Sequence, residues 1–220
     1  MGRGTASMSA VPAFARHGYA FRYPRGTVIF VQRDRASKLY LILEGVVKLS
    51  IFSDQGQERI IEFIRPYRFL GAPDVFSGSL YGITAIAYTE VVVAGFTAQQ
   101  VEELLSHDRE FAIHLAKSLS QHARALGRQL VGDSFYPAVG RVGFALLNLA
   151  VQIGAELEGT VVALPITQNE LARYVGCNRV TVTKAIAELA EAGLLKKQKK
   201  HLLVLDHVAL RRWLEDMVRV

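Results

Sequence analysis

Cysteine is almost absent from this chain: the 220 residues contain only Cys177. One cysteine excludes an internal disulfide and any four-cysteine zinc or iron–sulfur site built within the chain. The sequence also has no secretory signal pattern and no apolar run long enough to span a bilayer. We therefore expect a cytoplasmic protein with no membrane partner, in which Cys177 is a small buried residue.

Motifs of catalysis and metal binding are lacking as well. The chain has no glycine-rich phosphate loop, no Cys/His spacing typical of a metal site and no GxSxG turn. Its six histidines fall into no catalytic pattern. We expect no enzyme, no catalytic residue and no metal. The net charge of +6 favours an acidic partner without identifying it.

What the sequence does contain is a pattern for two short helices joined by a tight turn, between Thr167 and Lys184. Thr167 and Glu170 have the spacing of a capping box. Gly176 supplies the left-handed turn residue, and Asn178 is a good N-cap for the second helix. The pattern is typical of a helix-turn-helix whose second helix enters a DNA groove.

A lysine-rich segment follows directly. Residues 194–205 predict a hairpin with four lysines at its tip, which suits a wing that contacts phosphates; the alternative is a solvated charge run. The predicted DNA-binding residues are Thr167, Gln168, Asn178, Arg179, Val180, Thr181, Thr183, Lys184, Lys197, Lys199 and Lys200.

The N-terminal part has a different pattern. After a lead at residues 1–17, residues 18–97 form short apolar runs separated by turn signals, which favours a β-barrel or roll. Strands are expected at 39–43, 46–52, 58–64 and 85–96.

Residues 98–132 predict a long helix with a seven-residue repeat, ending in a hinge around Gly127 to Asp133. Such a repeat favours a homodimer seam, although the same pattern fits an amphipathic helix lying on its own barrel. The expected seam residues are Leu105, Ala112, Leu115, Leu119, His122 and Leu126. Residues 133–220 are expected to form the DNA-binding domain.

The order of these parts resembles the CRP/FNR superfamily of bacterial transcription regulators over residues 18–206. The runs that carry the resemblance are 39–49, 140–149 and 168–184. The resemblance implies an α+β fold: a cyclic-nucleotide-binding-like jelly roll, a long dimerisation helix and a C-terminal winged helix-turn-helix. It implies double-stranded DNA, a second copy of the chain and RNA polymerase as partners, the last through the loop 154–160. Residues 180–184 are similar to the branch that senses halogenated aromatics.

The family's effector chemistries can be compared with this sequence position by position. Where the resemblance implies a ribose-binding glutamate, the chain has Ala72; where it implies a phosphate-binding arginine and hydroxyl, it has Tyr81 and Gly82. A phosphate without a cationic partner is poorly compensated, so a weakly charged or aromatic small molecule is favoured over a cyclic nucleotide. The expected effector-binding residues are Phe63, Phe69, Leu70, Gly71, Ala72, Tyr81, Gly82, Ile83 and Leu126.

Two alternatives remain open for the roll. One is a haem-based gas or redox sensor, with an axial ligand among His17, His107, His114 and His122. The other is a ligand-independent constitutive regulator whose roll serves only to dimerise.

The recognition helix predicts the kind of operator. Arg179 is placed to read guanine, whereas Val180 can make only apolar contact, for example with a thymine methyl. We therefore expect an AT-rich palindrome with one guanine per half-site and half-sites about 34 Å apart.

Overall fold

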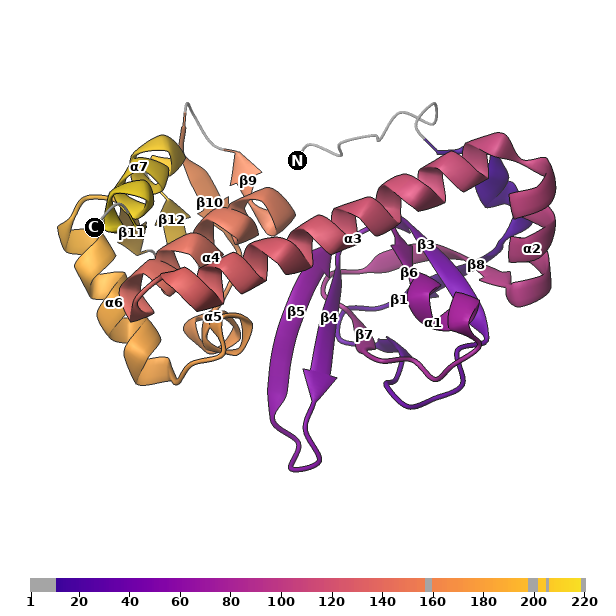
Figure 1. The fold of residues 1–220 in the computed structure, drawn as a ribbon, viewed down its shortest axis with the longest axis horizontal. Helices are drawn as coiled ribbons and strands as arrows, with labels where there is room; N and C mark the ends of the chain where they lie inside the picture. Colours follow the sequence, from indigo (N-terminus) through magenta and orange to yellow (C-terminus); the bar gives the residue numbers. More distant parts are fainter. Residues whose placement is uncertain (1–10, 157–159, 198–201, 205, 219–220) are drawn as a thin grey trace. The chain divides into compact units, whose positions relative to one another are not determined.

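The computed structural model describes residues 11–156, 160–197, 202–204 and 206–218 (Figure 1). Contacts within the chain define two compact units. One comprises Met1–Val47 with Ile64–Gln121, and the other comprises Lys48–Phe63 with His122–Val220. In the described part of the chain, no helix is both long enough and apolar enough to cross a membrane.

The first unit is built on antiparallel strands. The main sheet has the order β1-β8-β3-β6, and β2 pairs antiparallel with β7 in a second sheet. The strands are β1 (Tyr19–Tyr23), β2 (Val28–Phe30), β3 (Lys38–Glu44), β6 (Phe69–Leu70), β7 (Thr84–Ala87) and β8 (Val91–Thr97). The strand expected over 85–96 is thus two strands, β7 and β8, and a short helix, α1 (Ala72–Ser77), was not predicted.

Strand β3 carries apolar or aromatic side chains on both of its faces. Successive side chains of a strand point to opposite faces. Leu39 and Leu41 join a buried cluster with the neighbouring helices, whereas Tyr40 stacks on Phe30 with 5.9 Å between ring centroids. Both faces of the strand are therefore buried.

An aromatic cluster fills the space beside that sheet. Phe14, Phe69, Phe96 and Phe111 are almost fully buried, and the Phe14 and Phe111 rings meet edge to face at 5.2 Å. Phe14 belongs to a short 3-10 helix, η2 (Ala13–His17). The end of the predicted lead is therefore part of the core.

The helical segment after β8 is broken earlier than predicted. It consists of α2 (Ala98–His107) and α3 (Arg109–Phe135), with Asp108 extended between them. The Asp108 carboxylate accepts a hydrogen bond from the Phe111 amide, so it caps α3. The seven-residue repeat therefore does not run through Leu105, which lies on α2.

The other end of α3 also differs from the prediction. Gly127 and Gly132 lie inside the helix, which continues to Phe135, so the expected hinge around Gly127 to Asp133 is helical. A Cβ on Gly132 would lie 2.8 Å from Cδ1 of Phe144. Gly132 therefore does not end the helix; it allows the side chain of Phe144 to approach closely.

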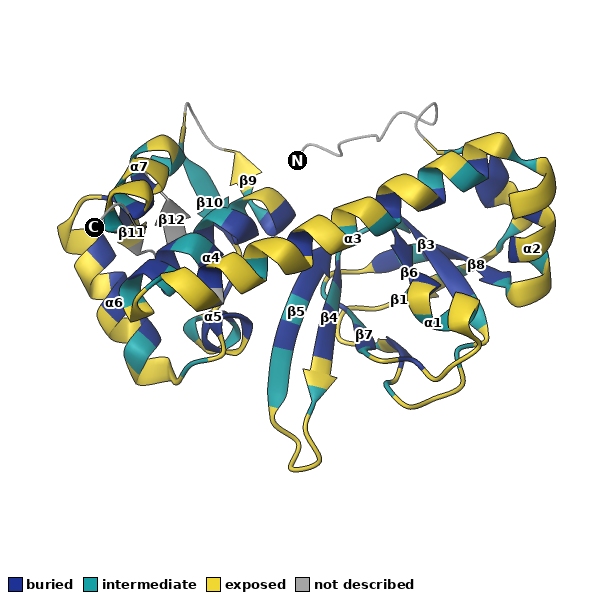
Figure 2. Cartoon of the chain, viewed as in Figure 1, coloured by how far each residue is buried: buried dark blue, intermediate teal, exposed yellow. Residues whose placement is uncertain are grey.

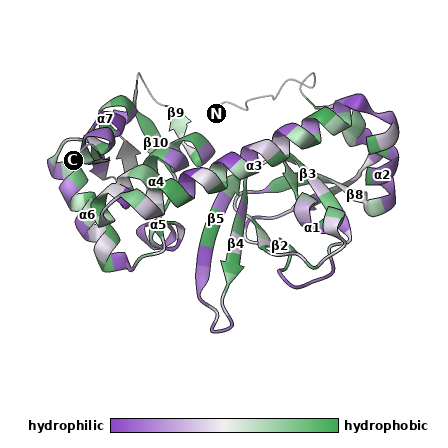
Figure 3. Ribbon diagram, in the orientation of Figure 1, coloured by the Kyte–Doolittle hydropathy of each residue, from purple (hydrophilic) through white to green (hydrophobic). Residues whose placement is uncertain are grey.

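The second unit contains a hairpin and the C-terminal domain. Strands β4 (Val47–Phe52) and β5 (Glu58–Ile64) pair through a turn at Ser53–Gln57. Strand β5 runs from hydrophilic residues near the turn to hydrophobic residues at its far end (Figure 3). The C-terminal sheet has the order β11-β12-β10-β9. Its strands are β9 (Ala155–Glu156), β10 (Val162–Leu164), β11 (Leu195–Lys197) and β12 (Leu202–Val204).

Among the described residues, four helices complete the C-terminal domain, and each buries one face (Figure 2). They are α4 (Ala138–Ile153), α5 (Gln168–Val175), α6 (Arg179–Glu191) and α7 (His207–Val218). Leu146, Leu171, Val182 and Leu210, one from each helix, are fully buried. The N-terminal jelly roll, long helix and C-terminal helix-turn-helix of the predicted α+β fold are confirmed.

Candidate nucleic-acid interface

Helix α5 begins and ends as the sequence predicts. The Thr167 hydroxyl accepts a hydrogen bond from the Glu170 amide, and the Glu170 carboxylate accepts one from the Thr167 amide, so the capping box is complete. Gly176 has φ of +73°, the left-handed conformation that ends the helix and starts the turn.

Helix α6 separates a buried face from a polar one. Asn178 caps it by accepting a hydrogen bond from the Thr181 amide at 2.8 Å. Val182, Ile186 and Leu189 are buried on the inner face. The outer face exposes Arg179, Val180, Thr183 and Lys184, with Val180 63% exposed, while Thr181 is half-buried. A small basic surface is thus presented at the N-terminal end of this helix.

Some predicted contact residues are already used inside the motif. The Thr167 hydroxyl also lies 2.7 Å from a Glu170 carboxylate oxygen. The Thr183 hydroxyl lies 2.9 Å from the Arg179 carbonyl and 3.2 Å from Oε1 of Gln168, so it joins the two helices. The Thr167 and Thr183 hydroxyls are therefore engaged within the motif, whereas Arg179 and Lys184 lie on its exposed face.

The predicted wing is present as the pair β11 and β12. Lys196 and Lys197 lie in β11, and Lys196 is exposed. Lys199 and Lys200 lie outside the described residues, so their predicted phosphate contacts stay a prediction.

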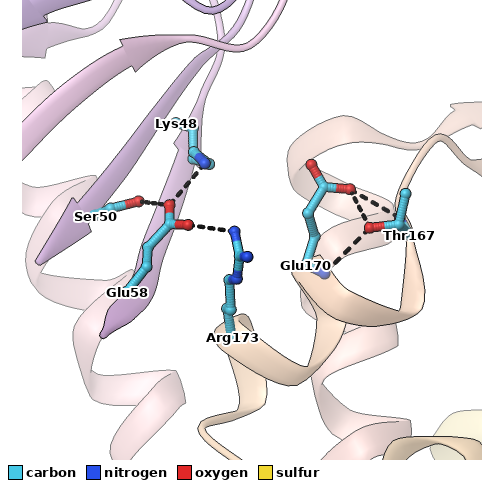
Figure 4. Close-up of polar contacts among 6 residues, drawn as sticks. All are labelled: Lys48, Ser50, Glu58, Thr167, Glu170 and Arg173. Carbon is cyan, nitrogen blue, oxygen red and sulfur yellow. Dashed lines mark hydrogen bonds and ion pairs between the residues drawn. The ribbon is translucent and has the colours of Figure 1, made fainter. Parts of the chain in front are cut away.

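An ion-pair network joins the β4–β5 hairpin to α5 (Figure 4). One oxygen of Glu58, Oε1, lies 2.7 Å from Nζ of Lys48 and accepts a hydrogen bond from Ser50 at 2.8 Å. The other, Oε2, lies 2.6 Å from a guanidinium nitrogen of Arg173. Burial by itself raises the pKa of Glu58, but the hydrogen bonds from Lys48 and Ser50 and the charges of Lys48 and Arg173 outweigh burial and lower it. Glu58 therefore carries its charge at neutral pH.

Further contacts join the same elements. Phe63 of β5 stacks on Tyr174 of α5 at 6.2 Å, and Gln152 of α4 accepts from the Phe63 amide while donating to the Tyr174 hydroxyl. The Arg59 guanidinium lies against Gly176, where a Cβ would overlap it. The hairpin thus contacts α5 at Arg173 and Tyr174 and the turn after it at Gly176.

Cys177 lies in the turn and is half-buried. Burial raises the pKa of its thiol, and the charges of Arg141 and Arg59 oppose that rise only in part. A thiol with a raised pKa is a poor nucleophile at neutral pH, which favours the structural interpretation of this residue over a redox one.

The predicted effector residues fall into different surroundings. Tyr81 stacks face to face on Phe30 at 4.0 Å, and its hydroxyl donates to the Lys38 carbonyl at 2.7 Å. A Cβ on Gly71 would lie 2.9 Å from the Tyr81 ring, so these two predicted residues are brought together. Leu70 is opposite Tyr40 in the sheet and is buried.

Other predicted effector residues have different neighbours. Phe69 and Ala72 belong to the cluster around Phe14, and Phe63 packs on Tyr174. Gly82 is exposed, Ile83 is half-buried and Leu126 is 50% exposed.

The predicted seam residues divide between two faces. Leu115 is buried in the aromatic cluster of its own unit, with Leu119 packed against that cluster, and Nδ1 of His122 lies 2.9 Å from a Glu62 carboxylate oxygen. Leu105 and Leu126 are exposed and Ala112 is half-buried. A partner helix could reach Leu126 but not Leu115.

Two histidines considered as haem ligands have roles in the fold. Nε2 of His114 donates to the Tyr67 carbonyl at 2.6 Å, and Nδ1 of His122 faces Glu62. Neither presents that nitrogen to a haem iron. Among the residues that the structure describes, no three His, Cys, Asp or Glu side chains gather as a metal site.

Comparison with known proteins agrees with this architecture. A family model described as a cyclic nucleotide-binding domain matches residues 20–108, and one described as a Crp-like helix-turn-helix domain matches residues 140–213. Together the two matches span well over half of the chain. The chain therefore belongs to the CRP/FNR family of transcription regulators.

Individual relatives match over nearly the whole chain. The CRP-like cAMP-activated global transcriptional regulator of Mycobacterium tuberculosis is 28% identical over 205 residues, which is 93% of this chain and 92% of the relative. The crystal structure of a CRP/FNR-family transcriptional regulator from Thermus thermophilus is 29% identical, with a TM-score of 0.76, covering 90% of this chain and 98% of that chain. These relatives are transcription regulators and not enzymes, which agrees with the prediction that this chain is not an enzyme.

A third protein shares the fold at lower identity. It is the c-di-GMP responsive global regulator CLP of Xanthomonas campestris, 22% identical with a TM-score of 0.76, covering 87% of this chain and 95% of that chain. The names of these relatives give different nucleotides, cyclic AMP for the first and c-di-GMP for the third.

Proposed function

We propose that the protein is an effector-responsive transcription regulator that binds a palindromic, AT-rich promoter site as a homodimer. The observation that carries the proposal is the recognition helix, which is capped by Asn178 and exposes Arg179, Val180 and Lys184 at its N-terminal end. These are the positions from which such a helix meets base edges. RNA polymerase remains a proposed partner through the segment 154–160, of which the structure describes only part.

A stripe on α3 supports the homodimer. The stripe consists of apolar or small residues that lie beside or opposite the buried row containing Leu115, when positions are plotted around the helix. Its members are Ala112, Ile113, Ala116, Leu119, Ser120, Ala123, Leu126, Gly127, Leu130 and Val131. Leu126 and Leu130 are 50% and 68% exposed, as expected of residues that a second copy would cover. Of the seam residues expected from the sequence, the proposed seam therefore retains Ala112, Leu119 and Leu126. Leu115 and His122 are left out, because they face the protein's own interior.

The surroundings of Tyr81 support a weakly charged, aromatic effector. Tyr81, Phe30 and Tyr40 form a stack of aromatic rings inside the roll. Burial raises the pKa of Tyr81, and the negative charges of Asp74 and Asp34 raise it further. The hydrogen bond to the Lys38 backbone lowers this pKa, but the net shift is upward. A phosphate would meet carboxylates here, so an anionic nucleotide is disfavoured and a neutral aromatic molecule is favoured.

Selection of bound fragments from a random DNA library tests the DNA-binding function. We expect a symmetric AT-rich consensus with one guanine per half-site, recovered by protein that sediments as a dimer. Recovery of no consensus, with and without small-molecule extract, would contradict the proposal. Recovery without extract at full affinity would favour the ligand-independent regulator.

Thermal unfolding in the presence of substituted phenols and of cyclic AMP tests the effector class. A ligand at 100 times its Kd stabilises the folded state by about 2.7 kcal/mol, which corresponds to roughly 5–10 °C for a chain of this size. We expect such a rise with a neutral aromatic compound and none with cyclic AMP. Tyr81→Leu should remove the rise, whereas Tyr19→Leu, at an exposed tyrosine of β1, should keep it. A rise with cyclic AMP alone would contradict the proposed class, and a Soret band in the purified protein would favour haem.

A further inference from the structure

The contact between the β4–β5 hairpin and α5 lies on the side of the motif that does not read DNA. Arg173, Tyr174 and Gly176 form it at the C-terminal end of α5. Thr167 and Gln168, two of the predicted DNA-binding residues, lie at the opposite end of the same helix. The contact leaves the outer face of α6 exposed, so it is compatible with bound DNA.

The ion pair at the centre of this contact can open without leaving a buried charge uncompensated. Glu58 keeps only 9% of its side-chain exposure, but Lys48 and Ser50 of its own hairpin hold Oε1. Only Oε2 faces Arg173, whose side chain is 49% exposed and can return to water. When a buried ion pair breaks, each buried charge normally loses the opposite charge that compensated it. Here each group keeps a partner or solvent, which suits a contact that is made and released.

We propose that Glu58 and Arg173 are positioning residues for DNA binding. Their ion pair, supported by the stacking of Phe63 on Tyr174, holds the helix-turn-helix on the hairpin in the orientation that the operator complex requires. A symmetric operator requires a fixed spacing between the two recognition helices. A helix-turn-helix that the hairpin already holds in place therefore loses less conformational entropy when it binds DNA. This inference rests on the proposed DNA-binding function.

Arg173→Met in the full-length protein tests the inference, because methionine keeps the apolar stem and removes the charge. We expect its affinity for the selected operator to fall about fivefold, the lower end of typical coupling effects. The matched control is Arg211→Met, at an exposed arginine of α7, which should change operator affinity less than twofold. Each variant loses one positive charge, so affinity for non-specific DNA should fall equally in both. Arg173→Lys should restore most of the loss.

A double-mutant cycle with Glu58→Gln separates positioning from a general effect of charge. If the two residues act through each other, Arg173→Met/Glu58→Gln should bind no more weakly than either single variant. Should Glu58→Gln fail to fold because Lys48 loses its counter-charge, exchange of the Phe63 amide hydrogen provides a second measurement. That amide bonds to Gln152 within the contact, and its exchange should accelerate in Arg173→Met but not in Arg211→Met.

The outcomes are separable. Wild-type operator affinity in Arg173→Met, or losses that multiply in the double variant, would overturn the positioning role. A wild-type protein that binds no operator would instead contradict the proposed function. A reduced fraction of active protein with an unchanged Kd would show that Arg173 serves only folding, which also overturns the inference.

Discussion

Leu130→Glu is expected to convert the proposed dimer into a monomer and to abolish tight binding to the palindromic operator. Leu130 is 68% exposed on the apolar stripe of α3, and two-fold symmetry brings the substitution into the seam twice. An unpaired charge buried in an interface costs about 3–5 kcal/mol. Loss of the tether between two recognition helices lowers operator affinity by roughly 10²–10⁴-fold. Sedimentation velocity and operator titration measure the two effects.

Val151→Glu is the control for this substitution. Val151 lies on α4 and is 72% exposed, so the variant adds the same charge to an exposed apolar side chain away from the stripe. It should remain dimeric and bind the operator normally. A Leu130→Glu protein that stays dimeric would place the seam elsewhere, and a wild-type protein that is monomeric at working concentration would contradict the homodimer itself.

The stripe shows what a sequence repeat can and cannot establish. The seven-residue repeat predicted a helix over 98–132, but the repeat alone did not decide which of its two rows faces the protein's own core. Leu115 is buried in one cluster with Leu39, Phe69 and Phe96, residues far away in sequence, and so its row faces the protein's own core. Only those long-range contacts decide which row is left for a partner.

The helix-turn-helix could be predicted in detail because its signals are local. The Thr167 and Glu170 capping box, the left-handed Gly176 and the Asn178 cap each act within four residues. Their hydrogen bonds join groups within the motif itself, so the local sequence carries most of the signal.

Features decided by distant residues could not be predicted in this way. Gly132 suggested a helix break, but its missing side chain accommodates Phe144. The break at Asp108 is different, because an aspartate N-cap is a local signal that was interpreted only as a polar position in the repeat. Arg173 and Glu58 are 115 residues apart, and no local pattern links them.

Arg179→Ala is expected to weaken binding to the selected operator by about 1–3 kcal/mol, or roughly 5–150-fold, while changing non-specific binding little. Arg179 is the first residue of α6 and is exposed, and its guanidinium presents the paired donors that match O6 and N7 of guanine. Arg179→Lys keeps the charge and loses the paired geometry, so it should lose most of the specific affinity as well. Titrations on operator and scrambled DNA at one fixed salt concentration measure both terms.

Replacing the half-site guanine by 7-deazaguanine tests the same contact from the side of the DNA. The modified base lacks the N7 acceptor, so wild-type protein should bind it more weakly than guanine, whereas Arg179→Ala should not distinguish the two. Equal losses on operator and scrambled DNA would mean that Arg179 contacts only phosphate. The guanine would then be read by Lys184 or through the shape of the duplex.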